Sequence, residues 1–108
     1  MAAVDPTPAP PPVAISPPLF NADYLANPPP PYPALSRRTG EHGRVILRVH
    51  VTPGGTVDDI QVRTSSGHAR LDDSALETVK RWKFVPAKQG AQPIAAWVLV
   101  PISFGLDS

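Results

Sequence analysis

Proline divides the chain into two parts, only one of which can fold. Twelve of its 16 prolines fall within the first 33 residues. Proline fixes its backbone and has no N–H to donate, and this segment lacks apolar periodicity, so it is typical of an extended, solvated polyproline chain. At about 3.1 Å per residue it could reach about 100 Å. We predict a proline-rich linker over residues 1–31 and one small domain over residues 32–108.

Charge is confined largely to the second part. All ten lysines and arginines and seven of the nine acidic residues follow residue 33. The excess of about three positive charges is mild and interspersed, so we expect no nucleic-acid partner. The early arginines form either a solvated face or a basic surface that meets an acidic partner: Arg37, Arg38, Arg44 and Arg48. The chain has no cysteine and no apolar run long enough to span a membrane, so any membrane anchor of the full-length protein is expected outside this chain.

The middle of the domain predicts a β-hairpin. From Gly43 to Val51 apolar and polar residues alternate, which is the period of a half-buried strand. A Pro-Gly-Gly turn follows, and residues 56–64 form the second strand, with a bulge expected near Asp58 and Asp59 because the alternation slips there. A short helix over residues 33–38 precedes the hairpin.

A second helix and a third strand complete the predicted domain. The helix is expected to run from Asp72, whose side chain would cap it, to about Trp82, because Ala75, Leu76 and Val79 recur with Trp82 at helical spacing. Residues 94–104 alternate again. The second helix connects the second strand to the third. If this crossover is right-handed, it leaves a gap beside the second strand, and the first strand fills that gap. We therefore predict an α+β fold with a three-stranded antiparallel sheet of order 2-1-3 and the helices on one face.

The third strand is expected to form an edge of this sheet. Its outward residues are unusually apolar for a solvent-facing set, and none is a lysine that would block pairing: Trp97, Leu99, Pro101 and Ser103. Two interpretations stay open. An extended peptide from a partner adds a strand beside residues 96–102, or the strand is covered by residues 20–33 or by a second copy of the chain.

Catalytic and metal-binding patterns are weak. Ser65, Ser66, His68 and Asp72 lie close together, but turn hydroxyls and a helix-capping carboxylate are the common use of such residues, and no glycine-flanked nucleophile accompanies them. The three histidines lie far apart, without cysteines or carboxylates at ligand spacing. We expect neither an enzyme nor a cofactor or metal site.

The domain resembles a known family in the order and spacing of several short motifs. These are Tyr32-Pro33, Gly43 with the alternating strand, the Ser65-Ser66-Gly67 turn, Leu71-Asp72, Trp82-Lys83-Phe84 with Pro86-Ala87, and Val100-Pro101-Ile102 with Phe104. Together they resemble the C-terminal domain of TonB, the periplasmic energy transducer of Gram-negative bacteria, over about Tyr32 to Leu106.

The resemblance implies a protein anchored in the inner membrane by a helix absent from this chain, and working with ExbB and ExbD. Its domain would bind the TonB box of outer-membrane receptors by strand addition, for powered uptake of substrates such as iron-siderophore complexes. The candidate partner-binding residues are Tyr32, Ala96, Trp97, Val98, Leu99, Val100 and Ile102. Tyr32 contacts the receptor or instead caps the apolar cluster where the linker enters. A structural envelope linker of the TolA type, a homodimer, and a proline-rich ligand that docks through residues 6–33 stay open as alternatives.

Overall fold

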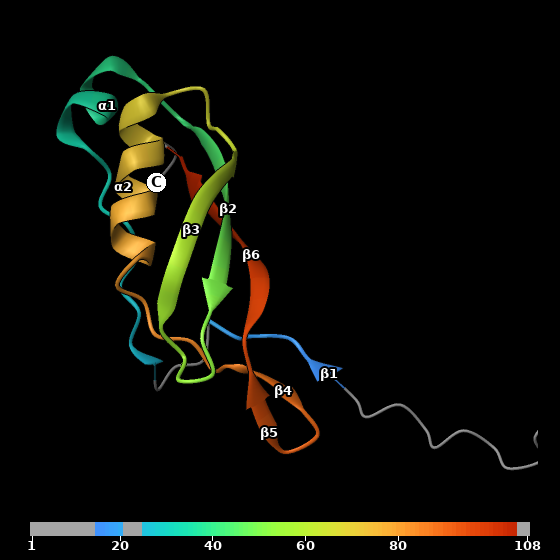
Figure 1. Ribbon diagram of the computed structural model, residues 1–108. Coiled ribbons are helices and arrows are strands. Elements are labelled where there is room, and N and C mark those ends of the chain that lie inside the picture. Colours follow the sequence, from blue (N-terminus) through green and yellow to red (C-terminus); the bar gives the residue numbers. More distant parts are fainter. Residues whose placement is uncertain (1–14, 21–24, 106–108) are drawn as a thin grey trace, which may run out of the picture.

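The computed structural model describes residues 15–20 and 25–105, so most of the predicted linker, residues 1–14 and 21–24, lies outside the described residues, as do residues 106–108. The described chain contains two helices and six strands (Figure 1). In chain order they are β1 (Ile15–Ser16), α1 (Ala34–Thr39), β2 (Gly43–Val51), β3 (Val57–Thr64), α2 (Ala69–Val79), β4 (Ala87–Gln89), β5 (Gln92–Ile94) and β6 (Ala96–Phe104).

The main sheet has the order β3-β2-β6 and is antiparallel throughout, which confirms the predicted order 2-1-3. The pairing of β2 with β6 is uninterrupted from Gly43 opposite Phe104 to Val51 opposite Ala96. Between β2 and β3 the register shifts at the position where His50 faces Asp59 but Val51 faces Val57. The extra residue is Asp58, so the predicted bulge is confirmed.

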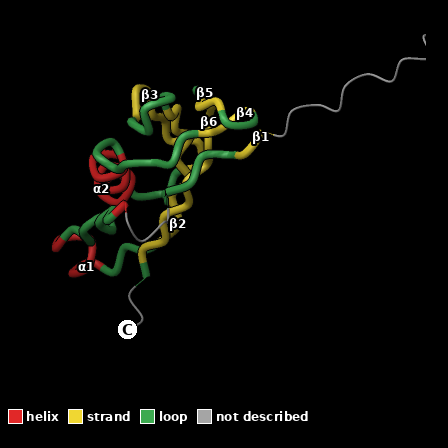
Figure 2. The backbone as a smooth tube through the Cα atoms, turned by 90° about the horizontal axis from the view of Figure 1, so that it is seen from below, coloured by secondary structure: helices red, strands yellow, loops and turns green. Residues whose placement is uncertain are grey.

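The core lies between this sheet and α2, and α1 lies on the same side of the sheet (Figure 2). The inward residues of β2 are fully buried, as the alternation predicts: Val45, Leu47, Val49 and Val51. From α2 they meet Leu71, Ala75 and Val79, also fully buried. Burying one such leucine or valine stabilises the fold by about 1.5–3 kcal/mol.

The predicted boundaries of the second helix are wrong by about one turn at each end. The helix begins at Ala69, after His68 in an extended conformation, and its regular part stops at Val79. Asp72 lies in the first turn and accepts hydrogen bonds from the preceding loop instead of capping the helix. Trp82 nevertheless joins the core at 7% exposure, and its indole nitrogen donates to the Pro28 carbonyl at 2.7 Å.

The first helix agrees with its prediction to within one residue. Pro33 precedes it as the N-cap residue and accepts a backbone hydrogen bond from Arg37 at 3.0 Å. Gly40 ends it with φ 78°, a left-handed conformation that a residue with a Cβ adopts only with strain. The chain then enters β2 three residues later.

A second, smaller sheet of order β1-β4-β5 was not predicted. The sequence assigned residues 94–104 to one strand, but the structure divides it at Ala95. Gly90, with φ 64°, lets the chain turn between β4 and β5, so that Gln92–Ile94 pair back on Ala87–Gln89 before β6 begins.

The described parts of the predicted linker contact the domain as a strap, residues 15–20 and 25–31. β1 pairs with β4, and Leu19 exchanges two backbone hydrogen bonds with Val85 at 3.0 and 2.8 Å. Phe20 stacks on Trp82 with ring centroids 5.9 Å apart. The strap therefore closes one end of the apolar core, while the domain boundary at residue 31 stays a prediction.

Asn27 fastens the second part of the strap. Its side chain donates to the Lys83 carbonyl at 2.7 Å and accepts from the Lys83 N–H at 2.8 Å. The N–H and C=O of Lys83 follow the end of α2 and have no partner within the helix. The Asn27 amide supplies the hydrogen bonds that a longer helix would have made. Among the described residues, no helix is long and apolar enough to cross a lipid bilayer.

Candidate functional site

The strand β6 lies at an edge of the main sheet. One side of it pairs with β2, and among residues 15–20 and 25–105 no strand pairs with the other side. Val98, Val100 and Ile102 point inward and belong to the core or pack against it. Trp97 and Leu99 point outward and are 38% and 44% exposed. The edge that the sequence predicted is therefore present in the described chain.

Pro101 indicates which peptide groups of β6 face the free edge. It lies opposite Ile46 within the uninterrupted register. In an antiparallel pair the N–H and C=O of successive residues point alternately to the two sides, and a proline nitrogen turned toward β2 would leave one bond of the ladder unmade. The arrangement that loses no bond turns Pro101 toward the free edge. We infer that the peptide groups of Trp97, Leu99 and Ser103 point the same way.

The indole of Trp97 contacts two side chains of β2. The guanidinium carbon of Arg48 lies 3.9 Å from the centre of the indole ring, and the His50 ring lies 4.8 Å away, centre to centre. His50 in turn contacts Asp58 through Nδ1 at 2.5 Å. Sequence reasoning missed this cluster, because it depends on a register between strands that lie almost fifty residues apart.

Tyr32 lies at the opposite end of β6. Its ring meets Phe104 edge to face with centroids 5.5 Å apart, and the Arg37 guanidinium lies 5.2 Å above it. Its hydroxyl donates to the Glu41 carbonyl. This half-buried position suits the capping role that the sequence left open, and it is separate from Trp97 and Leu99.

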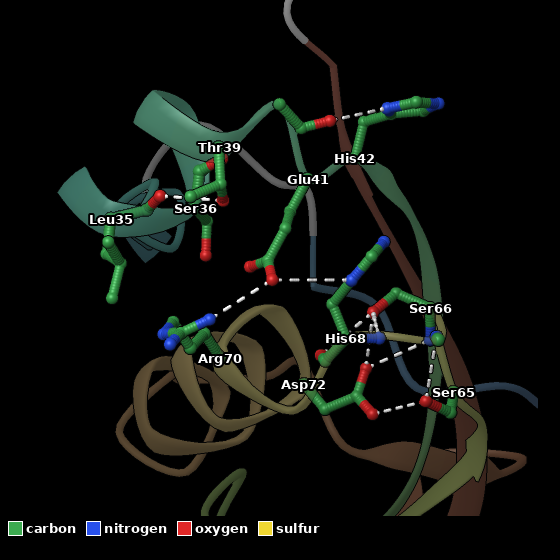
Figure 3. Close-up of polar contacts among 12 residues, drawn as sticks. Leu35, Ser36, Thr39, Glu41, His42, Ser65, Ser66, His68, Arg70 and Asp72 are labelled. Atoms are coloured by element: carbon green, nitrogen blue, oxygen red, sulfur yellow. Dashed lines mark hydrogen bonds and ion pairs between the residues drawn. The ribbon is translucent and has the colours of Figure 1, made fainter.

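The cluster of serines, histidine and aspartate fastens a turn, as Figure 3 shows. The Asp72 carboxylate accepts hydrogen bonds from both hydroxyls, Ser65 and Ser66, and from the Ser66 N–H at 2.9 Å. Burial raises the pKa of Asp72, but these hydrogen bonds outweigh it and hold the pKa below its ordinary value. The arrangement orders the loop that leads from β3 into α2.

His68 does not connect the aspartate to either serine. Its Nδ1 instead lies 3.5 Å from Glu41, which also pairs with Arg70 at 3.1 Å (Figure 3). In a catalytic triad the imidazole lies between the nucleophile and the acid. The observed contacts join the α1–β2 loop to the start of α2, which is a structural role.

The remaining polar candidates are dispersed. Each histidine has a separate partner, and no three histidines, aspartates or glutamates of the described chain converge as metal ligands would. The four early arginines do not share one face. Arg37 and Arg38 lie on α1, while Arg44 and Arg48 lie on β2 at positions that alternate with its buried residues.

Comparison with known proteins agrees with this architecture. The family model described as "Gram-negative bacterial TonB protein C-terminal" matches residues 28–106. The chain is 53% identical over 90 residues to Protein tonB2 of Pseudomonas aeruginosa, covering 83% of this chain and 33% of that protein. It is 38% identical over 79 residues to Protein TonB of Xanthomonas campestris pv. campestris, covering 73% and 35%. The chain thus spans about a third of the length of these curated relatives.

Solved structures show the same relationship. The solution NMR structure of the Pseudomonas aeruginosa TonB CTD superposes with a TM-score of 0.66 at 28% identity, covering 87% of this chain and 88% of that one. The fold is also shared with the Helicobacter pylori TonB-CTD, residues 194–285, at a TM-score of 0.55, over 72% of this chain and 82% of that one, at 24% identity. With the family model covering residues 28–106, the chain belongs to the family of C-terminal domains of Gram-negative bacterial TonB proteins.

Proposed function

We propose that this domain works in the periplasm and binds the TonB box of outer-membrane receptors by adding the receptor peptide as a strand beside β6. Through that contact it would transmit energy from the inner membrane, where ExbB and ExbD act on an anchor outside this chain, to active uptake of substrates such as iron-siderophore complexes. The single observation that carries the proposal is the side of β6 with which no strand of the described residues pairs, in a domain of this family.

The orientation of the peptide groups gives the proposal its detail. Trp97 and Leu99 each offer a donor and an acceptor to a guest strand, whereas Pro101 offers only its carbonyl. Ala96, Val98, Val100 and Ile102 are the alternate residues of the strand, so their peptide groups serve the pairing with β2. Within the candidate set, the backbone contacts are therefore assigned to Trp97 and Leu99, and the others supply the framework. Tyr32 is assigned to fixing the far end of β6 through Phe104.

The expected strength suits a contact that must be released. About four hydrogen bonds at a net value of about 1 kcal/mol each, with apolar contact from Trp97 and Leu99, must offset the loss of translational and rotational freedom. Binding in the micromolar range, about 8 kcal/mol, is the result expected. A pull directed along the strand would load these bonds together.

A titration followed by NMR tests the proposal at single-residue level. The 15N-labelled domain is mixed with a synthetic peptide carrying the TonB-box sequence of an outer-membrane receptor, and amide hydrogen exchange is measured with and without the peptide. The Trp97 and Leu99 amides should exchange fast in the free domain and become protected in the complex. The Val98 and Val100 amides, which bond to β2, should be protected in both states.

A peptide of the same composition with proline at alternate positions is the control, because it cannot donate to the edge. It should leave the exchange of Trp97 and Leu99 unchanged. Shifts confined to the strap, or no response to the TonB-box peptide, would contradict strand addition at β6. A concentration-dependent protection of the same amides without peptide would instead indicate a homodimer formed through this edge.

A further inference from the structure

An open hollow lies on the outer face of the main sheet, over parts of β3, β2 and β6. It has a volume of about 330 Å³ and is lined by Arg48, Arg63, Trp97, Val98 and Leu99. Both helices of the described chain pack on the opposite face of the sheet (Figure 2), so they leave the hollow open to solvent. A strand added to β6 would project half of its side chains toward this same face.

Two guanidinium groups line this hollow without an acidic partner among the described residues. The four ion pairs of the described chain involve neither Arg48 nor Arg63. Arg48 lies opposite Leu99 in the register, yet its guanidinium lies over the ring of Trp97, so the side chain reaches diagonally from β2 to β6. A guanidinium stacked on a ring keeps its N–H donors free in its own plane.

The acidic residues on this side of the sheet belong to β3. Asp58 is already paired with His50, and Asp59 lies opposite His50 on β3. His50 thus stands between these carboxylates and β6. The part of the hollow next to the free edge is left with Arg48 and the indole of Trp97, which together favour an anionic group.

We propose that this hollow binds a carboxylate side chain of the peptide strand that pairs with β6. The inference rests on the proposed function, because the guest strand must be in place. A guest residue directly opposite Trp97 or Leu99 projects to the same outer face. An aspartate or glutamate there lies next to β6, to which the Arg48 side chain already reaches from β2. Arg63, from β3, contributes its positive field.

The partner is therefore an extended peptide with two different faces. Its inward side chains continue the apolar row of Val98 and Val100, and its outward side chains include at least one acid. Strand addition by itself is nearly independent of sequence, because it uses the backbone. The carboxylate contact adds a preference for an acidic side chain at one position of the guest strand, which backbone pairing alone does not provide.

Two synthetic peptides test this assignment. In one, valine alternates with glutamate, and in the other each glutamate is replaced by glutamine. Calorimetric titration of the wild-type domain should give about tenfold tighter binding of the glutamate peptide, and the preference should shrink as salt is added. Arg48→Gln should reduce the preference to about twofold or less, and Arg48→Lys should keep part of it because the charge remains without the planar stack. Arg38→Gln, on exposed α1, is the matched control and should keep the full preference.

The outcomes separate this inference from the function on which it rests. Equal affinity for the two peptides, with the Trp97 and Leu99 amides protected by both, overturns the carboxylate site and leaves strand addition standing. A preference that is as large in Arg48→Gln as in the wild type overturns the assignment to Arg48. If neither peptide binds at β6, the proposed function and this inference are both overturned.

Discussion

Replacing Leu99 with proline tests the free side of β6 without breaking the pairing of its other side with β2. Leu99 lies two residues before Pro101 on the same strand, so its peptide group points the same way. Its N–H is therefore expected at the free edge and not in the ladder with β2. Its side chain is 44% exposed, and the pyrrolidine ring retains part of the apolar surface. Leu99→Pro should therefore change the free energy of unfolding by only about 1 kcal/mol.

The same change should weaken peptide binding strongly. The guest strand loses one hydrogen bond, worth about 1 kcal/mol, and the proline ring occupies the space where the guest carbonyl would approach. A total loss of about 2 kcal/mol corresponds to about thirtyfold in Kd. Leu99→Ala is the control for the side chain, because it keeps the N–H and removes most of the apolar contact; its effect on Kd should be smaller.

Val98→Pro provides the contrast on the same strand. Val98 lies opposite Val49, and its N–H is expected to bond to β2, so proline there should cost about 3 kcal/mol of stability. Urea unfolding measures the stability of each variant, and calorimetry with a TonB-box peptide measures binding. A folded Leu99→Pro domain with unchanged affinity would falsify the use of this edge. If Val98→Pro is tolerated and Leu99→Pro unfolds the domain, the peptide group of Leu99 points to β2 and that of Val98 to the free edge, the reverse of what we infer.

Three further substitutions test the core, a close approach and a titrating group. Val79→Asp places an unpaired charge on the fully buried face of α2 and should unfold the domain, which an unchanged melting curve would contradict. Gly55→Ala should cost more than about 1 kcal/mol in urea unfolding, because φ is 83° and its Cβ would lie 2.3 Å from the Phe84 carbonyl oxygen. The lowered pKa of Asp72 contributes stability that is present above its unfolded pKa of about 3.9 and is lost as the pH falls through the lower folded value. Asp72→Asn should therefore flatten the acid side of the stability-versus-pH curve, and an identical acid side in both proteins would refute this contribution.

Periodicity predicted the main sheet well because its signal is strong and local. Val45, Leu47 and Val49 alternate with polar residues and are all fully buried, and the slip at Asp58 appears in the structure as a bulge. The central place of β2 followed from a topological rule about crossovers and not from any residue. These elements depend on one strand or on one connection, so a single sequence is enough to predict them.

The errors arise where a distant partner decides the local structure. Asp72 is a good capping residue by type, but the serine hydroxyls before the helix compete for its carboxylate and move the helix start to Ala69. The pairing of β5 back on β4 needs a turn at Gly90 that the alternation of residues 94–104 conceals. In both cases the sequence contained the residues but not the contact that selects their conformation.

The strap illustrates the same limit. A proline-rich segment lacks the apolar surface for a core of its own, so the sequence predicted an extended linker over residues 1–31. The described parts of that segment use the surface of the domain instead, since Phe20 stacks on Trp82 and the indole donates to Pro28. Nothing within the segment itself indicates this, because the partner residues lie more than fifty positions later.

The candidate site could be predicted in part, and Pro101 explains why. Alternation along a strand reports its two faces, and this identified Trp97 and Leu99 as outward. It does not report the two sides, toward which the peptide groups point, because every residue other than proline has both an N–H and a C=O. Pro101 lacks the donor, so once its partner Ile46 is known it distinguishes the side that pairs with β2 from the side that is free. Pro101 removes one donor from the edge, and it is also the residue from which the donors of the candidate residues Trp97 and Leu99 can be assigned to that edge.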